Sequence, residues 1–405
     1  MRCQDGRVAE LIGIEEARRR VLATARTLGG ESVPLDSALG RVLCEEVRSP
    51  VDVPPFDNSA MDGFAVPPGA DGALEVIDEA RAGAPSSTAL APGTAVRIST
   101  GAAVPRGTEA VVAIERAEED GNMVTVSPSK PGSNIRRRGE DVGAGDSVMS
   151  AGAVLRPAAL GVLASLGRSA ALCSERPGVA ILATGDELVE PGSDLGPGQI
   201  WSSNPVALAG QVRQAGGLVE RKDRIPDDPE VTRRELESAA AADVVIVSGG
   251  VSVGPHDHVK GALAAIGAEE VFWGVALRPG KPIWFGTLAV GGRTVSVFGL
   301  PGNPVSAMVG FQLFVRPALQ ALQGADPGAT RATAVLDEDI ARNPGRAQAV
   351  RCRLSSADDG LHATTTGPQG SHVLTSMLAA DGLALVEAGD GAMRRGERVQ
   401  VELLS

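Results

Sequence analysis

The sequence predicts a multidomain protein of α/β and β structure, built around a doubly wound α/β domain. The chain has 405 residues, which is more than a single hydrophobic core usually serves. Over residues 177–325, continuous apolar runs alternate with helical patterns, as in doubly wound α/β folds. Residues 51–147 and 326–405 instead contain short apolar runs interrupted by Gly and Pro, which indicates β-rich domains.

The N-terminal part of the chain predicts a helical linker domain. Residues 8–28 carry a helical stripe of apolar side chains, and a second helical pattern follows Pro157. We expect residues 148–175 to pack against the N-terminal helix. The sequence thus divides into four domains: an elongated helical linker domain (1–50 with 148–176), a β-rich domain (51–147), the α/β domain (177–325) and a small C-terminal β-barrel (326–405).

Three runs in the α/β domain have the continuous apolar character of buried parallel strands. They are GVAILAT (178–184), DVVIVSGG (243–250) and TVSVFGL (294–300). Asn204, followed by Pro205, predicts a helix that begins with Asn as its cap. The last of the three strands leads into PGNP and a long apolar helix that ends near residue 322. We therefore expect a parallel sheet with helices packed against it.

Charge and cysteine usage exclude several classes of protein. The formal net charge is −12, whereas a nucleic-acid partner requires a basic surface. The four cysteines lie far apart and form no CxxC pair, so they indicate neither a zinc framework nor a disulfide scaffold. The N-terminus lacks a signal-type apolar segment, and no apolar run reaches the length that crosses a bilayer. We expect a cytoplasmic protein with no membrane partner.

Three loops follow these strands, at the edge where open α/β sheets bind ligands. The first, TGDEL (184–188), places Asp186 and Glu187 directly after a buried strand. Two carboxylates at this position suit Mg²⁺ or acid/base chemistry. The alternative is that Asp186 caps the next turn and Glu187 is simply exposed.

The second loop, SGGVS (248–252), resembles a phosphate cradle in form. Ser248, Gly249 and Gly250 leave backbone N–H groups that can face an anion, and a helix follows. Asp257, five residues beyond Ser252, can reach the same site. The alternative is a plain turn.

The third loop, LPGNP (300–304), starts a helix at Asn303 and Pro304, and such a rigid helix start can bind an oxyanion. An ordinary helix start is the alternative. Arg278 and Lys281 add two cations beside a Gly/Pro loop, which suits phosphate or another tetrahedral oxyanion unless they are merely solvated.

The β-rich domain carries three further polar motifs. FDNSAMDGFAV (56–66) includes Asp62, RISTGAAVPRGTEAVV (97–112) includes Thr100, and NIRRRGEDV (134–142) includes Asp141. A run of charges such as RRRGED most often forms a solvated surface strip.

Taken together, the motifs resemble the molybdopterin molybdenumtransferase family, of the MoeA and gephyrin E-domain type. The resemblance covers nearly the whole chain and rests on FDNSAMDGFAV, STGAAVPRGTEAVV, NIRRRGEDV, ATGDEL, NP at 204–205, VSGGVSVGPHDH, LRPGKP and FGLPGNPVSA. It implies an elongated dimer of four-domain subunits. The implied reaction inserts molybdenum from molybdate into adenylated molybdopterin, releases AMP and requires Mg²⁺.

The resemblance also implies roles for individual residues. Asp62, Asp141, Glu187 and Asp257 match the family's functional acids, and Glu187 with Asp257 would hold Mg²⁺. Arg278 replaces the lysine that is often found there, which exchanges a point charge for a planar fork. The positions that match the substrate and oxyanion side are Thr100, Asp228, Ser252, Lys281, Pro301, Pro304, Ser306, Arg351 and Ser376.

Other functions stay open at this point. A molybdopterin adenylyltransferase is the rival enzyme, a gephyrin-like scaffold is the rival without catalysis, and a CinA-like nucleotide hydrolase is more distant. The expected partners of a molybdenumtransferase are adenylated molybdopterin, molybdate, a second copy of the chain and a molybdopterin adenylyltransferase. Because Asp62 lies on a different domain from the three loops, we hypothesise that it reaches the site from the partner subunit.

Overall fold

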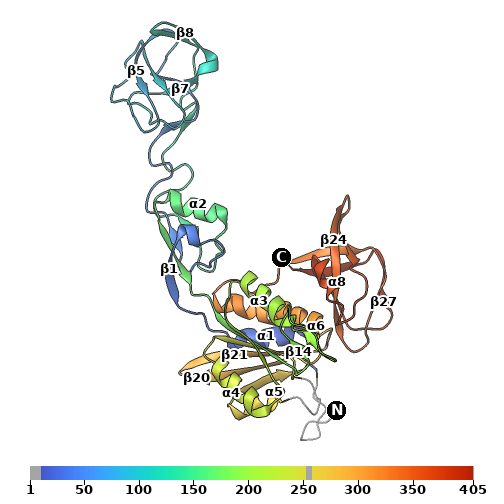
Figure 1. Cartoon of the computed structure of the whole chain (residues 1–405). Coiled ribbons are helices and arrows are strands. Elements are labelled where there is room, and N and C mark those ends of the chain that lie inside the picture. Colours follow the sequence, from blue (N-terminus) through green and yellow to red (C-terminus); the bar gives the residue numbers. More distant parts are fainter. Residues whose placement is uncertain (1–10, 252–257, 405) are drawn as a thin grey trace. The chain divides into compact units, whose positions relative to one another are not determined.

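The computed structural model describes residues 11–251 and 258–404, and these fall into two compact units. The larger unit contains Met1–Glu31, Gly40–Cys44 and Leu172–Ser405, and the smaller unit contains Ser32–Leu39 and Glu45–Ala171. Figure 1 shows the elements of both units, coloured along the chain. The finer division into four domains stays a proposal.

The larger unit is built on a mixed six-stranded sheet in the order β16-β13-β17-β21-β20-β18. Its first four strands are parallel, and β20 runs antiparallel to both of its neighbours. The expected α/β class is confirmed, but the sheet is not wholly parallel. Gly291 and Gly292 both have positive φ, so they form a two-residue turn that joins β20 and β21 as a hairpin. The strands are β13 (Gly178–Thr184), β16 (Leu218–Ile225), β17 (Val244–Ser248), β18 (Glu269–Trp273), β20 (Trp284–Val290) and β21 (Arg293–Leu300).

Helices cover both faces of this sheet, as the doubly wound pattern predicts (Figure 1). Alternate residues of β13 enter different cores: Ile181 packs with α1, α3 and α6, and Leu182 packs with α4 and α5. Helix α1 buries Ala17 in the first of these cores, whereas we expected it to pack with residues 148–175. The helices are α1 (Ile14–Thr24), α3 (Asn204–Gln214), α4 (Pro229–Ala239), α5 (Val259–Ala265), α6 (Pro304–Gly310), a π-helical turn η3 (Phe311–Val315) and α7 (Arg316–Leu322).

The continuous helix Pro304–Leu322 corrects one expectation from the sequence. By length and composition it could cross a bilayer, although we expected no such run. About four-fifths of it (78%) is buried inside the protein, and Val305, Val309 and Phe314 belong to the main core. It is apolar because other elements surround it, so it is a core helix.

The C-terminal residues form the expected small barrel. Five strands close into a ring because β24 pairs with both β25 and β26, and β28 links β22 with β26. A short strand from the sheet region, β19 (Leu277–Arg278), pairs in parallel with the start of β24. The barrel strands are β22 (Arg331–Leu336), β24 (Ala347–Ala357), β25 (Gly360–Thr365), β26 (Gly382–Val386) and β28 (Arg398–Leu403), with β23 (Ile340–Ala341), β27 (Ala392–Met393) and helix α8 (Thr375–Leu378) beside them.

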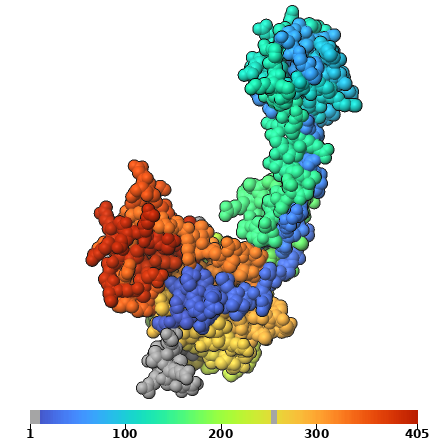
Figure 2. Space-filling model, turned by 180° about the vertical axis from the view of Figure 1, so that it is seen from behind, coloured from blue at the N-terminus to red at the C-terminus, as the bar shows by residue number. Residues whose placement is uncertain are grey.

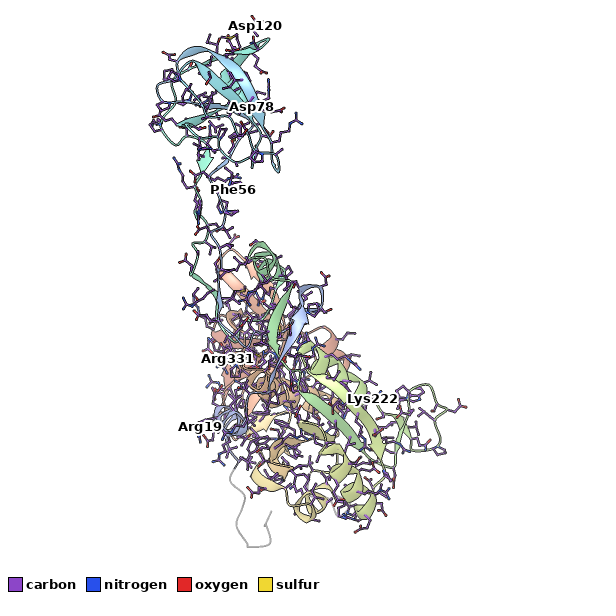
Figure 3. The ribbon with its side chains drawn as sticks, turned by 90° about the vertical axis from the view of Figure 1, so that its left-hand side faces the viewer. Arg19, Phe56, Asp78, Asp120, Lys222 and Arg331 are labelled. Carbon is purple, nitrogen blue, oxygen red and sulfur yellow. The ribbon has the colours of Figure 1, made fainter. Side chains whose placement is uncertain are left out.

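Ion pairs fasten helix α1 to this barrel. Arg18 contacts buried Glu402 at 2.8 Å, and Arg331, labelled in Figure 3, contacts Glu15 at 2.6 Å. Figure 2, a view from behind, shows the blue N-terminal part with α1 next to the orange-red C-terminal part. The sheet and the barrel are therefore joined by α1 as well as by β19.

The smaller unit is β-rich, as expected. Its main sheet has the order β7-β4-β6-β5-β9-β8, and apolar residues such as Phe64 and Val112 fill its core. The sheet strands are β4 (Gly63–Val66), β5 (Gly72–Ala80), β6 (Thr94–Ile98), β7 (Ala110–Ala113), β8 (Ala117–Asp120) and β9 (Met123–Val126). Further short strand pairs are β1 (Gly30–Pro34) with β12 (Ala170–Ser174), β2 (Val47–Arg48) with β11 (Ser147–Met149), β3 (Asn58–Ser59) with β10 (Ile135–Arg136) and, in the larger unit, β14 (Leu188–Val189) with β15 (Ile200–Trp201). Helix α2 (Pro157–Ser165) and the 3₁₀ turns η1 (Leu35–Ser37) and η2 (Ile114–Arg116) belong to the smaller unit.

Candidate functional site

The three strand-end loops lie together in the larger unit. Their strands β13, β17 and β21 are adjacent and parallel, so Thr184, Ser248 and Leu300 end at one edge of the sheet. The amide of Gly249 donates to the Leu300 carbonyl at 3.0 Å. A Cβ on Gly249 would lie 2.7 Å from Thr184 Oγ1, and its φ of +97° favours glycine. Close packing between the loops therefore requires glycine here.

This packing changes the interpretation of SGGVS. The cradle we expected uses the free N–H groups of both glycines, but that of Gly249 is already bonded to Leu300. A Cβ on Gly250 would lie 2.4 Å from Val259 Cγ2, so this glycine lets α5 approach the loop. The glycine pair thus has a packing role of its own.

Asn204 connects two of the loops and was not among the predicted site residues. Its Nδ2 donates to Ser248 Oγ at 2.8 Å and to the Gly302 carbonyl at 2.7 Å. We expected Asn204 to cap α3, but Ser203 occupies the cap position and Asn204 begins the helix. The Asn-Pro pair predicted a helix start here, but the sequence did not predict that Asn204 contacts two Gly-rich loops.

The carboxylates of the first loop are exposed. Asp186 Oδ1 accepts from the amide of Asp227 at 3.2 Å. Glu187 folds over Gly185, where a Cβ would lie 2.5 Å from its Oε2. The side chain of Asp228 caps α4 by accepting from Val231 N at 2.8 Å. Ser252 and Asp257 lie outside the described residues.

A cavity of about 390 Å³ opens beside these loops, between sheet and barrel residues of the larger unit. Arg278, Lys281, Arg346 and His372 line it, and no Asp or Glu does. None of these four side chains pairs with a carboxylate among the described residues. The other lining residues are Pro279, Gly280, Pro282, Pro301, Asn303, Ser306, Gln369, Gly370 and Ser371. Five predicted residues, Arg278, Lys281, Pro301, Asn303 and Ser306, therefore meet in one cationic cavity.

A second cavity of about 280 Å³ shares Arg278, Pro279 and Gln369 with the first. Arg351 lines it and is fully buried, without a carboxylate partner among the described residues. Burial alone lowers the pKa of its guanidinium to about 10. A buried cation without a partner favours an anion in contact with it, but Glu338 and Asp339 also line this cavity.

The expected role of Ser376 differs in the structure. Ser376 is buried, accepts from Arg351 Nε at 3.1 Å and donates to the Val373 carbonyl at 2.6 Å. It supports Arg351 and does not line either cavity. Residues 369–372 of the loop 367–372 (GPQGSH) line the cationic cavity instead. Sequence reasoning missed this loop, although a Gly/Pro turn with polar residues after a strand was a usable signal.

In the smaller unit, the three polar motifs also come together. Strand β3 of the first motif pairs with β10 of the third, and the amide of Ser59 donates to the Ala102 carbonyl of the second at 3.0 Å. Asp62 Oδ1 accepts from the amide of Thr100 at 2.8 Å, and both residues are exposed. Two of the predicted residues are therefore neighbours.

The arginines of the third motif are largely used within this unit. Arg137 pairs with Asp57 at 2.7 Å and Arg138 pairs with Asp52. The amide of Arg138 and the guanidinium of Arg137 hold the pKa of Asp57 below its ordinary value. Asp141 is exposed, and its amide donates to the Val53 carbonyl at 3.0 Å.

Comparison with known proteins shows where the chain belongs. Three family models match in order: the MoeA N-terminal region (domain I and II) over 12–167, a probable molybdopterin binding domain over 180–321 and the MoeA C-terminal region (domain IV) over 333–404. The molybdopterin molybdenumtransferase of Haemophilus influenzae is 37% identical, over 92% of this chain and 93% of that protein. This chain belongs to the MoeA family.

Further relatives agree with this assignment. Molybdopterin molybdenumtransferase 2 of Mycobacterium tuberculosis is 36% identical over 96% of this chain and 98% of its own length. The crystal structure of the molybdopterin biosynthesis moeA protein from Pyrococcus horikoshii OT3 matches with a TM-score of 0.84 and 31% identity, covering 97% of this chain and all of that one. The chain is thus a molybdenumtransferase-type enzyme of molybdenum cofactor biosynthesis, and its multidomain fold is that of the MoeA proteins.

The described residues offer Mg²⁺ single carboxylates and no ready-made cluster. Among the described residues no three Asp, Glu, His or Cys side chains converge as a metal cluster. Mg²⁺ commonly uses only one or two carboxylates together with substrate phosphates and water. Glu187, an exposed carboxylate with no side-chain partner among the described residues, suits this mode.

Proposed function

We propose that this MoeA-family chain inserts molybdenum from molybdate into adenylated molybdopterin, releases AMP and requires Mg²⁺. The cationic cavity carries the proposal. Both substrates are anions, and the cavity presents the cations Arg278, Lys281 and Arg346, with no Asp or Glu among its described lining residues. A cavity that served a neutral or cationic substrate would leave these charges unbalanced.

The residues of the larger unit would bind and orient the two anions. Lys281 would act as a point charge on one oxyanion, and Arg278 would present a planar fork at the boundary of the two cavities. Ser306 and Asn303 would add neutral polar contacts that fix orientation. Holding both reactants in one cavity lowers the entropic part of the barrier.

The acidic residues would promote cleavage of the phosphoanhydride bond, the step that releases AMP. Glu187 and Asp257 would hold Mg²⁺, which would neutralise charge on the phosphoanhydride oxygens. Asp228, with one carboxylate oxygen engaged as a helix cap, would keep its second oxygen for the substrate side. Asp62, Thr100 and Asp141 would complete the site from the β-rich domain.

The same proposal includes a homodimer, in which Asp62 reaches the three loops from the partner subunit. Mixing Asp62→Ala protein with Glu187→Ala protein tests this, because each variant damages a different domain. Mixed dimers carry one intact site and should recover part of the activity. If the mixture stays as inactive as its components, the site is not shared between subunits.

The cellular setting is part of the proposal. The chain would act in the cytoplasm and receive adenylated molybdopterin from a molybdopterin adenylyltransferase. Neither nucleic acid nor membrane would take part, which agrees with the net charge of −12 and with the burial of the apolar helix Pro304–Leu322.

The deciding experiment measures AMP. Purified protein is incubated with adenylated molybdopterin and Mg²⁺, with and without molybdate. We expect AMP release that depends on both molybdate and Mg²⁺, and Lys281→Ala should reduce it strongly. If AMP appears at the same rate without molybdate, the transferase proposal fails.

A further inference from the structure

We propose that Arg346 of the barrel binds the same tetrahedral oxyanion as Lys281 and Arg278, so that one anion bridges the sheet and the barrel. Arg346 precedes β24 and lines the cationic cavity. Its side chain is half-buried. The inference rests on the proposed function for the identity of the anion, which would be molybdate or a phosphate group of the substrate.

Strand pairing fixes the position of Arg346. The next residue, Ala347, pairs with Leu277 in the parallel register of β19 and β24, and its amide donates to the Ala276 carbonyl at 2.9 Å. Arg278 pairs with Gln348 one step further along. Arg346 is therefore held next to the Arg278–Lys281 segment by main-chain hydrogen bonds, and a mobile loop is not needed to bring the charges together.

The charge balance of the cavity points to an anion. Two barrel arginines outside the cavity have carboxylate partners: Arg331 contacts Glu15 at 2.6 Å, and Arg394 contacts Asp339 at 2.7 Å. Arg346 has none among the described residues, although two further cations line the same cavity. Like charges that share a partly desolvated space repel one another, and a bound dianion would relieve this repulsion.

The donor set favours a tetrahedral oxyanion. An arginine fork can contact two oxygens of one anion, and Lys281 can contact a third as a point charge. Ser306 and Ser371, which line the same cavity, supply neutral polar atoms for the remaining oxygen. These donors come from both sides of the cavity, because Lys281 and Ser306 belong to the sheet domain and Arg346 and Ser371 to the barrel.

A bridging anion has a thermodynamic consequence. Any ligand that binds only the folded protein stabilises it, and this one also removes repulsion between the barrel and the sheet domain. Molybdate should therefore raise the melting temperature of the protein, and the rise should depend on Arg346. This readout needs no turnover.

The test compares Arg346→Ala, Arg346→Lys and the wild-type chain by calorimetric titration and thermal unfolding, with molybdate and AMP as separate ligands. Arg353→Ala is the matched control, because Arg353 is an exposed arginine on β24 that lines neither cavity. We expect Arg346→Ala to raise the Kd of at least one of the two ligands about tenfold or more, Arg346→Lys to recover part of this, and the control to leave both Kd values unchanged.

The two ligands identify the anion. If Arg346→Ala loses affinity only for molybdate, the metal oxyanion binds at Arg346. If it loses affinity only for AMP, a substrate phosphate binds there. If neither Kd changes in Arg346→Ala relative to Arg353→Ala, the inference is overturned.

The ligand-free melting temperature of Arg346→Ala should equal or exceed that of the wild type, which separates lost binding from misfolding. If the wild type shows Arg346-dependent binding but no molybdate-dependent AMP release, the oxyanion site stands and the transferase proposal fails.

Discussion

The side chain of Gln369 forms hydrogen bonds with both the amide and the carbonyl of Arg351. Gln369 Oε1 accepts from the amide of Arg351 at 2.9 Å, and its Nε2 donates to the Arg351 carbonyl at 3.2 Å. The guanidinium of Arg351 in turn donates to the carbonyl of Gly370 at 3.1 Å. The neighbouring Ser371 carbonyl accepts from Val305 N of α6 at 3.2 Å. The loop 367–372 is thus fixed between the barrel and the PGNP loop.

These hydrogen bonds predict how Gln369→Ala affects stability and substrate binding. The change removes two hydrogen bonds to the Arg351 backbone and loosens the loop that carries Ser371 and His372 into the cationic cavity. We expect a loss of about 1–3 kcal/mol of stability and a raised KM for molybdate. Gln400→Ala, which removes an exposed hydrogen bond to Thr333 on the barrel, is the control. An unchanged KM in Gln369→Ala would refute the positioning role.

A second prediction concerns Asn204, whose amide joins the SGGVS and PGNP loops. In Asn204→Ala the buried Ser248 hydroxyl loses its partner, which costs about 1–3 kcal/mol, and the loops can separate. We expect turnover to fall more than stability explains. Gln211→Ala, on the same helix and bonded to Met308, should leave turnover near wild type. Equal turnover in both variants would argue against a role of Asn204 in the site.

A third prediction concerns the buried pair Arg18–Glu402. Glu402 is fully buried, and burial holds the pKa of nearby Arg316 below its ordinary value while Glu402 opposes this. Removing the carboxylate in Glu402→Ala leaves buried cations uncompensated, so we expect a loss of about 3–5 kcal/mol in urea unfolding. Glu237→Ala breaks an exposed pair with Arg233 and should cost less than about 1 kcal/mol. Similar losses in the two variants would contradict this account.

A fourth prediction is a pH dependence of barrel stability. His362 lies 2.8 Å from both Asp337 and Asp359, and hydrogen bonds to these two carboxylates raise its pKa. A raised folded-state pKa gives stabilisation that is fully present below the unfolded value of about 6.5 and is lost as the pH rises through the folded value. His362→Gln should therefore be less stable than wild type near pH 5–6, and the difference should shrink at higher pH. Urea midpoints across this range measure it; a gap independent of pH would disprove the charge-based explanation.

The sequence predicted the strand-end loops well because their signals are local. A continuous apolar run followed by Gly, Pro and polar residues marks both the strand and the loop, as at Thr184 and Leu300. The contribution of Arg346 and Gln369 depends on pairing between strands that are far apart in sequence, such as β19 with β24. No local pattern encodes that pairing, so these residues were missed. The hairpin at Gly291-Gly292 was missed for a different reason, because an apolar run does not reveal strand direction.

Strand β19 also limits how the protein can be divided. Its two residues, Leu277 and Arg278, belong by sequence to the α/β domain but complete one edge of the barrel at Ala347 and Gln348. A fragment covering only residues 326–405 would expose that edge as unsatisfied main-chain donors and acceptors, which invites strand-to-strand association. The barrel is therefore no independent module, and a successful transplant of it into another protein would have to carry the Leu277–Arg278 strand along.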